Sequence, residues 1–260
     1  MTSDSSGPTR MDFSSGYTTG TAHCEKHGEF TVRMFNGKPM SICPACADES
    51  LSEGLGHVEA ENRLLAESKL KEALGQAGIP RRFADKTLDT FVAEDTQQKA
   101  IILDSVRAYA KDFRLNHGLG RSLVFYGGTG NGKTHLACGV ASAIIAQGFT
   151  AHFCTAIQAV RRVKETYSRE STVTEEAAIK ALASPDLLIL DEVGIQFGTV
   201  AENIILFEII NRRYLDVLPT IVISNLGEAE ITGYLGERVM DRLRENGGKS
   251  IFFPWPSYRK

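Results

Sequence analysis

One short run of this sequence has the residue types and spacing of a phosphate-binding loop. Residues 127–134 read GGTGNGKT and fit G-x-x-x-x-G-K-[ST] at every fixed position, between an apolar run and a helical segment. The glycines let successive backbone N–H groups turn toward a phosphate, and the helix N-terminus adds partial positive charge. Lys133 can reach the β- and γ-phosphates, and the Thr134 hydroxyl can bind Mg²⁺. The predicted nucleotide-binding residues of this loop are Gly127, Gly128, Thr129, Gly130, Asn131, Gly132, Lys133 and Thr134.

Two acids end a second apolar run, DLLILDE at residues 186–192. If this run is a strand, Asp191 and Glu192 lie at the carboxyl edge of the sheet, where α/β proteins bind their ligands. We expect Asp191 to hold the Mg²⁺ shell and Glu192 to polarise the attacking water. Asn225 ends the run TIVISN and can hydrogen-bond the γ-phosphate or that water, although Asn after a strand is also a common turn residue.

A second set of residues near the N-terminus has the spacing of metal ligands. A C-x₂-H pair and a C-x₂-C pair flank residues 28–42, which are long enough for a hairpin with its turn at Asn36-Gly37. Four such ligands fill a tetrahedral shell, which predicts a structural Zn²⁺ site. His23 is an alternative to the expected histidine ligand. The predicted zinc ligands are Cys24, His27, Cys43 and Cys46.

Alternating apolar runs and helical segments predict the elements that hold the nucleotide site. Five short runs with helix-period sequence between them indicate an α/β fold, a parallel five-stranded sheet covered by helices on both faces. The runs are SLVFY (122–126), TAHFC (150–154), DLLIL (186–190), TIVIS (220–224) and SIFFP (250–254). Cys138 and Cys154 fall on a core helix and strand, and we expect them to be buried as small hydrophobic residues.

Composition divides the 260-residue chain into four parts. With a net charge of −3, the chain as a whole has no excess of positive charge that would attract nucleic acid, so any DNA contact would depend on a local basic patch. No apolar run approaches the roughly 18 residues of a membrane span, and no signal peptide is apparent, so we expect a cytoplasmic protein with no membrane contact. The predicted parts are a disordered polar tail (1–22), a zinc-knuckle module (23–50), a helical linker or partner-binding segment (51–79) and the ATPase domain (80–260).

The chain from GIPRRF at residue 78 onward resembles the AAA+ ATPase domain of DnaC-type replicative helicase loaders, in the DnaC/IstB-like family. Besides the phosphate-binding loop, the resemblance is carried by LLILDEVGIQ, ISN, LGERVMDRLR and the closing WPSYRK. It implies a sheet ordered 5-1-4-3-2, ATP-dependent assembly on single-stranded DNA and delivery of a replicative helicase. The zinc knuckle departs from the family pattern. By analogy, residues 23–77 bind the helicase partner. The knuckle could instead contact nucleic acid, or only stabilise the fold of a small module.

The last helical segment carries arginines of two possible kinds. Residues 237–245 are expected to form a helix with Val239, Met240 and Leu243 facing inward. Arg238 and Arg242 lie one turn apart, and ion pairs with Asp241 and Glu245 would make them a neutralised surface. The resemblance instead matches Arg242 to an arginine finger given to the γ-phosphate of a neighbouring subunit. Arg238 is the weaker candidate, for the same interface or for a structural ion pair.

The last expected strand ends close to the C-terminus, so we expect the helical lid of a typical AAA+ module to be missing. A neighbouring subunit in a nucleotide-dependent homo-oligomer is therefore expected to cover the nucleotide.

Residues 155–171 form the most basic stretch and are candidates for single-stranded DNA contact, with a solvated helix face as the alternative. Its candidate contact residues are Arg161, Arg162, Lys164, Tyr167 and Arg169.

Three functions are compatible with these residues. The leading one is an ATPase that hydrolyses ATP to ADP and phosphate while loading a helicase during DNA replication. One alternative is an IstB-like transposition helper ATPase, and another is an ATP-switched adaptor without productive turnover. Intact Lys133, Asp191 and Glu192 favour hydrolysis over the adaptor.

Overall fold

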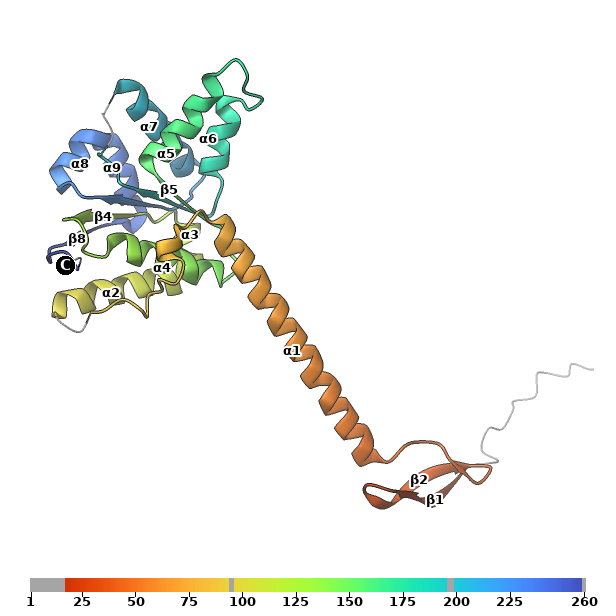
Figure 1. The fold of residues 1–260 in the computed structure, drawn as a ribbon. Helices are drawn as coiled ribbons and strands as arrows, with labels where there is room; N and C mark the ends of the chain where they lie inside the picture. Colours follow the sequence, from red (N-terminus) through yellow and green to blue (C-terminus); the bar gives the residue numbers. More distant parts are fainter. Residues whose placement is uncertain (1–16, 94–95, 196–198, 259–260) are drawn as a thin grey trace, which may run out of the picture. The chain divides into compact units, whose positions relative to one another are not determined.

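The structure, a computed structural model, describes residues 17–93, 96–195 and 199–258. The chain divides into two compact units, Met1–Glu67 and Ser68–Lys260, and the boundary falls within the long helix α1, Pro44–Gln76 (Figure 1). This boundary lies inside the segment 51–79 that composition indicates as a linker. Residues 1–16 of the predicted tail lie outside the described residues.

The first unit contains an antiparallel ribbon whose first strand the composition did not predict. Its strands are β1 (Tyr17–Cys24), β2 (Gly28–Phe35) and β3 (Lys38–Pro39). The predicted turn at Asn36-Gly37 is confirmed, with φ of 50° and 77°, the positive values that a two-residue hairpin turn requires. The prediction that the tail runs to residue 22 is wrong, because β1 pairs with β2 along its whole length and its threonines suit a strand.

Helix α1 begins seven residues earlier than its sequence composition suggests, at Pro44 rather than at Leu51. Proline is well suited to the first helical position, where no N–H is needed and φ is already helical. The CPAC run therefore starts a helix instead of preceding one. Although α1 has 33 residues, no helix in the described part of the chain is long and apolar enough to cross a membrane.

The second unit is built on a five-stranded sheet ordered β5-β6-β7-β4-β8, in which every neighbouring pair is parallel. In chain order within this sheet, that is the predicted 5-1-4-3-2 arrangement. All five predicted strands are confirmed to within one residue at each end. They are β4 (Leu123–Gly127), β5 (Ala151–Thr155), β6 (Leu187–Asp191), β7 (Thr220–Ser224) and β8 (Lys249–Phe253).

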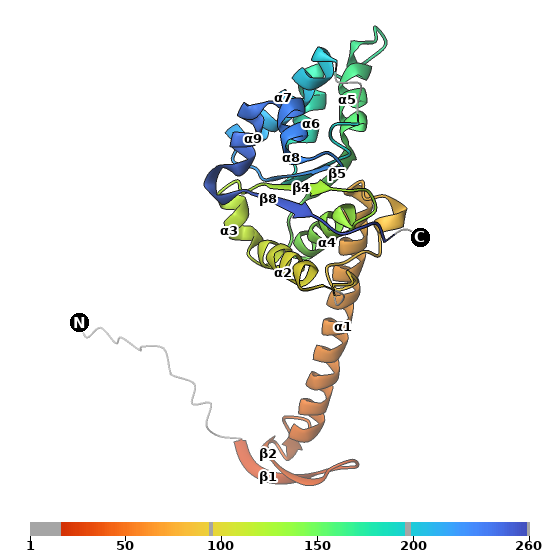
Figure 2. The same ribbon diagram turned by 90° about the vertical axis from the view of Figure 1, so that its left-hand side faces the viewer.

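Helices cover both faces of this sheet, as predicted (Figures 1 and 2). One face carries α2 (Gln97–Lys111), α3 (Phe113–Gly118) and α4 (Lys133–Ile145). The other carries α5 (Ala156–Lys164), α6 (Glu175–Ala183), α7 (Val200–Leu215), α8 (Glu228–Leu235) and α9 (Glu237–Arg244). Along β4, Phe125 packs into the first of these layers and Val124 into the second, as alternation in a strand requires. The sheet is therefore buried on both faces, and its carboxyl edge is left for the site.

Candidate nucleotide and metal sites

The phosphate-binding loop connects β4 to α4, and two of its glycines have no room for a side chain. Gly127 has φ of 130°, and a Cβ there would lie 2.5 Å from the Phe253 carbonyl oxygen. Gly132 has φ of 94°, and its Cβ would lie 2.6 Å from the ring of Phe91. Both positions are strained or blocked for any L side chain. The two fixed glycines of the motif are thus required by the backbone and by the close approach of neighbouring segments.

Lys133 is buried inside this loop, with only 4% of its surface exposed. Its ammonium donates hydrogen bonds to the carbonyl oxygens of Gly127 (2.8 Å) and Gly128 (2.6 Å) and to Oδ1 of Asn131 (3.0 Å). Buried charge is costly unless such partners replace water. The loop therefore holds a desolvated cation that phosphate oxygens can attract by replacing these oxygens.

Thr134 and Asp191 meet at the carboxyl edge of the sheet. The Thr134 hydroxyl donates to Oδ2 of Asp191 at 2.8 Å, and the backbone N–H of Glu192 donates to Oδ1 at 2.7 Å. Burial raises the pKa of Asp191, against the lowering effect of these two hydrogen bonds. A hydroxyl beside a carboxylate is an oxygen donor set that Mg²⁺ prefers. Thr134 and Asp191 therefore fit the magnesium-holding role expected of them.

Glu192 stands in an unusual backbone conformation directly after β6, with φ of 59°. A left-handed conformation at a residue other than glycine costs about 1–3 kcal/mol and is concentrated at functional sites. The next residue, Val193, is tied to β7 through its N–H, which donates to the Ile223 carbonyl at 3.0 Å. The exposed Glu192 side chain lines the same cavity as Asn225, which follows β7. The three strand-end residues predicted to act together therefore lie around one space.

That space is a cavity of about 860 Å³ beside the phosphate-binding loop. Of the residues predicted for the nucleotide site, 129–134, Asp191, Glu192 and Asn225 line this cavity, whereas Gly127 and Gly128 do not. Other lining residues were missed, because the motif does not include them and all but His135 come from distant segments. They include Arg82, Lys86, Phe91, His135 and Tyr258. The only sequence signals for this wall are GIPRRF and WPSYRK, the two runs that carried the family resemblance at its ends.

The three arginines of α9 have different surroundings. Arg244 donates to Glu228 at 2.7 Å, whereas Arg238 is exposed and has no ion-pair partner among the described residues. The Arg242 guanidinium lies over the rings of Phe207 (5.4 Å) and Tyr214 (5.1 Å) of α7. Its Nη1 is buried and has no hydrogen-bond partner among those residues. The ion pairs with Asp241 and Glu245 that spacing suggests are not formed in the described part of the chain, so the neutralised-surface interpretation is wrong.

The inward face of α9 is confirmed, since Val239, Met240 and Leu243 are buried in the core. Cys138 and Cys154 are buried as expected, and burial raises the pKa of each thiol to about 12. Both behave as small core residues.

The basic stretch on α5 is only partly available for DNA. Lys164 pairs with Glu202 at 3.1 Å, and the Tyr167 hydroxyl donates to Glu175 at 2.7 Å. Arg161, Arg162 and Arg169 are exposed and have no ion-pair partner in the described ranges. Three of the five expected contact residues are therefore uncommitted within the chain.

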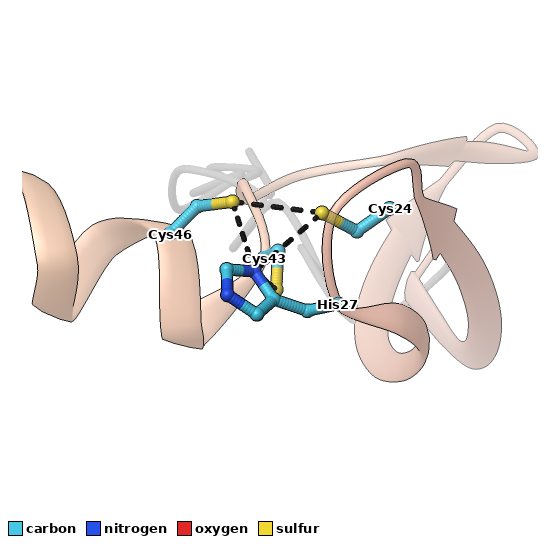
Figure 3. A group of neighbouring side chains, drawn as sticks. All are labelled: Cys24, His27, Cys43 and Cys46. Carbon is cyan, nitrogen blue, oxygen red and sulfur yellow. Dashed lines mark hydrogen bonds between the residues drawn. The ribbon is translucent and has the colours of Figure 1, made fainter.

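The predicted zinc ligands come together from the turn between β1 and β2 and from the start of α1, and Figure 3 shows the four side chains converging. Their ligand atoms all lie within 4.8 Å of one another. Sγ of Cys46 is 3.5 Å from Sγ of Cys24 and 3.3 Å from Nδ1 of His27. Bonds of about 2.3 Å to sulfur and 2.0 Å to nitrogen around one tetrahedral ion give separations of this size. The residues therefore fit a structural Zn²⁺ ion, with His27 and not His23 in the ligand set.

Groups around the cluster are arranged as metal sites require. Nε2 of His27 lies 3.1 Å from Oε1 of Glu49, which leaves Nδ1 facing the thiols. A carboxylate on the outer nitrogen fixes the tautomer and the ring orientation of a metal-binding histidine. The backbone N–H groups of His27 and Lys26 lower the pKa of Cys24 to about 6, whereas the hydrogen bond with Cys24 raises the pKa of Cys46 to about 11, so Cys24 is the thiolate of this pair.

Together, a phosphate-binding loop, a hydrogen-bonded hydroxyl–carboxylate pair beside it and a parallel sheet in the order 5-1-4-3-2 define the second unit as an ATP-binding module of the AAA+ class. The profile of the IstB-like ATP binding protein family matches residues 49–243. The chain belongs to this DnaC/IstB-like family.

Relatives named replicative helicase loader DnaC match most of the chain. The one from Buchnera aphidicola subsp. Acyrthosiphon pisum (strain APS) is 32% identical over 241 residues, which cover 89% of this chain and 95% of the relative. The one from Escherichia coli (strain K12) is 32% identical over 203 residues, which cover 78% of this chain and 79% of the relative. A crystal structure of the DnaC helicase loader shares the fold, with a TM-score of 0.60 and 23% identity over 67% of this chain and 99% of that one.

Proposed function

We propose that this protein is an ATP-hydrolysing helicase loader that assembles on single-stranded DNA and delivers a replicative helicase during DNA replication in the cytoplasm. The observation that carries the proposal is the 32% identity to a replicative helicase loader over 95% of that relative's length, which includes the segment before the ATPase core. The intact cavity with Lys133, Asp191 and Glu192 supports turnover.

Each cavity residue has a separate task in hydrolysis. Lys133 moves from the loop carbonyls to the β- and γ-phosphates, and Thr134 with Asp191 holds Mg²⁺, which neutralises phosphate charge when bound. Glu192 orients a water and accepts its proton as the water oxygen bonds to the γ-phosphorus, while the bond to the β,γ-bridging oxygen breaks. Asn225 donates its amide hydrogen bond to the γ-phosphate or to that water. The products are ADP and phosphate.

The remaining positive charge comes from a second copy of the chain. Arg242 is the proposed arginine finger, because its guanidinium is already oriented by the rings of Phe207 and Tyr214 and its side chain lines a surface hollow. Arg238 and Arg242 line one surface hollow, so the same face presents both candidates to a neighbour. Nucleotide-dependent assembly follows, since one protomer's phosphate joins it to the next.

The first unit is the proposed helicase-binding part. On α1, Leu51, Leu55 and Val58 are exposed and spaced four and three residues apart, so they share one face of the helix. Exposed apolar residues with this spacing are typical of a helix that docks into a partner groove. The zinc cluster fixes the start of this helix. Single-stranded DNA is proposed to contact Arg161, Arg162 and Arg169 on the other unit.

A loading assay tests the function. The purified protein is mixed with the replicative helicase of the same host, ATP and circular single-stranded DNA coated with its binding protein, and helicase bound to DNA is measured. We expect a complex with the helicase and ATP-dependent transfer to DNA, with transfer lost in Lys133→Ala. No helicase binding at micromolar concentrations would contradict the loader function.

The transposition alternative is addressed by the same design. The matched family carries the name IstB-like, which favours testing a transposase in place of the helicase. Stimulation of a transposase without helicase binding would replace the loader by the transposition helper. Nucleotide binding with helicase recruitment but no phosphate release would instead identify the ATP-switched adaptor.

A further inference from the structure

The end of β8 and the segment that follows it lie against the phosphate-binding loop, and residues Phe253–Tyr258 are here called the strap. The backbone N–H of Tyr258 donates to the carbonyl of Gly130 at 2.9 Å. The indole N–H of Trp255 donates to the carbonyl of Asn131 at 2.7 Å. Two consecutive carbonyls of the loop are therefore held by the strap. These bonds join residues more than a hundred positions apart in the chain.

These two bonds fix the direction of the loop's N–H groups. In a planar trans peptide, the C=O of one residue and the N–H of the next point in opposite directions. A Gly130 carbonyl turned to the strap therefore turns the Asn131 N–H away from it, and the Asn131 carbonyl does the same for the Gly132 N–H. Gly130, Asn131 and Gly132 line the cavity, where such N–H groups face a phosphate. The strap therefore binds the loop on the side opposite to the N–H groups that face the phosphate.

The Asn131 side chain links the strap to the loop lysine. It is 1% exposed, its Nδ2 donates to the Phe253 carbonyl at 2.9 Å, and its Oδ1 accepts from Lys133 at 3.0 Å. A side chain held at both ends in this way has no rotational freedom. The Asn131 amide therefore couples the position of the Lys133 ammonium to the position of the strap.

The outer side of the strap is anchored to other elements. The Tyr258 hydroxyl donates to the Val92 carbonyl at 3.1 Å, and the Lys99 ammonium of α2 lies 4.3 Å from the centre of the Tyr258 ring. Lys99 also lies 5.5 Å from the centre of the Trp255 ring. Cation–π contacts of this kind stabilise the ring positions. The strap therefore contacts α2 through Lys99 on one side and donates its hydrogen bonds to the loop on the other.

We propose that Trp255 and Asn131 are positioning residues for nucleotide binding, through which the strap orients the loop N–H groups and Lys133 toward the phosphates. The proposal rests on ATP binding at this loop, which is part of the proposed function. The strap acts on bound nucleotide and transition state alike, so its loss weakens ATP binding and leaves turnover at saturation unchanged.

Trp255→Phe tests this because it keeps a ring and removes the indole N–H. We expect the KM and the dissociation constant for ATP to rise about three- to tenfold, the range for one lost hydrogen bond, with kcat near that of wild type and a cooperative melting transition in the absence of nucleotide. Tyr109→Phe is the matched control, since it removes one buried hydroxyl bond, to the Arg121 carbonyl, and changes neither the strap nor the nucleotide cavity. Its KM should stay within about twofold of wild type.

A second measurement needs no variant. Trp255 is the only tryptophan in the chain, so its fluorescence reports the strap alone. Titration of the wild-type protein with ATP should change this emission with the same dissociation constant that calorimetry measures. Unchanged emission during saturation, or an unchanged KM in Trp255→Phe, would overturn the proposal while leaving ATP binding intact. A wild-type protein that binds no ATP would instead contradict the proposed function itself.

Discussion

The nucleotide cavity and the arginine face of α9 both present cations suited to phosphate, but they present them differently. Lys133 is buried, and three oxygens of its own loop accept its hydrogen bonds. Arg242 rests on two aromatic rings, with one nitrogen that is buried and lacks a hydrogen-bond partner in the described chain, and Arg238 is exposed. A satisfied cation belongs to a site that is complete within one chain. A cation on rings without oxygen partners is suited to a phosphate that comes from elsewhere. Half of the proposed active site is therefore built into the chain, and half awaits a second copy.

The largest effect is expected at Arg242, which is proposed to act on the nucleotide of a second copy of the chain. Arg242→Ala should lower kcat for ATP hydrolysis about 10³- to 10⁵-fold, the range for an arginine finger, while ATP binding to the same chain is retained. Steady-state phosphate release and equilibrium ATP binding measure the two quantities. Arg238→Ala, made in parallel, decides between the candidates. A full loss in Arg238→Ala with normal activity in Arg242→Ala would transfer the role to Arg238.

The next largest effect is expected at Glu192, which belongs to the nucleotide cavity within one chain. Glu192→Gln keeps the size of the side chain and its place after β6, but it removes the carboxylate that accepts the proton. Turnover should fall about 10²- to 10⁴-fold, with ATP affinity near that of wild type. Single-turnover phosphate release at saturating ATP is the measurement. Turnover that does not respond to this change would exclude Glu192 as the base.

The elements of the nucleotide half were predictable from sequence for a physical reason. The loop, its strand and its helix are consecutive, and the spacing of Lys133 and Thr134 is fixed by a local backbone conformation. The apolar strands were equally visible, because a parallel sheet buried on both faces needs continuous apolar runs. The strand order came from family resemblance, not from the residues alone.

What the sequence did not reveal depends on contacts between distant segments. The surroundings of Arg242 come from α7, about thirty residues before it, and no local spacing signals two rings beneath a guanidinium. The bond from Trp255 to Asn131 spans 124 positions. Strand β1 was mistaken for part of a polar tail because its threonines are common in both, and only pairing with β2 distinguishes them.

The Cys/His cluster extends the comparison, since its four candidate zinc ligands also come from one chain. Glu49→Gln removes the carboxylate beside Nε2 of His27 and should weaken zinc affinity about 10- to 100-fold, measured by competition with a chromogenic chelator. Glu53→Gln, one turn further along α1, is the matched control and should bind zinc as wild type does. Equal affinities in the two variants would remove the supporting role of Glu49. A wild-type chain without one bound zinc would contradict the site itself.

The smallest effect is expected at the third arginine. Arg244 is already paired with Glu228 on the surface, so Arg244→Gln should change the free energy of unfolding by no more than about 1 kcal/mol and leave ATP turnover unchanged. Chemical denaturation and phosphate release measure both. A large loss of turnover in this variant would mean that pairing within the chain does not separate structural arginines from functional ones.

Mixing two inactive variants tests most directly whether the two halves meet between chains. Lys133→Ala removes the phosphate-binding cation but keeps Arg242, and Arg242→Ala keeps an intact cavity without the finger. Each alone should hydrolyse ATP at background rates. Combined in equal amounts, they should recover activity, because the cavity of one chain receives Arg242 from the other. A mixture that assembles with ATP but recovers no activity would contradict an active site shared between two chains.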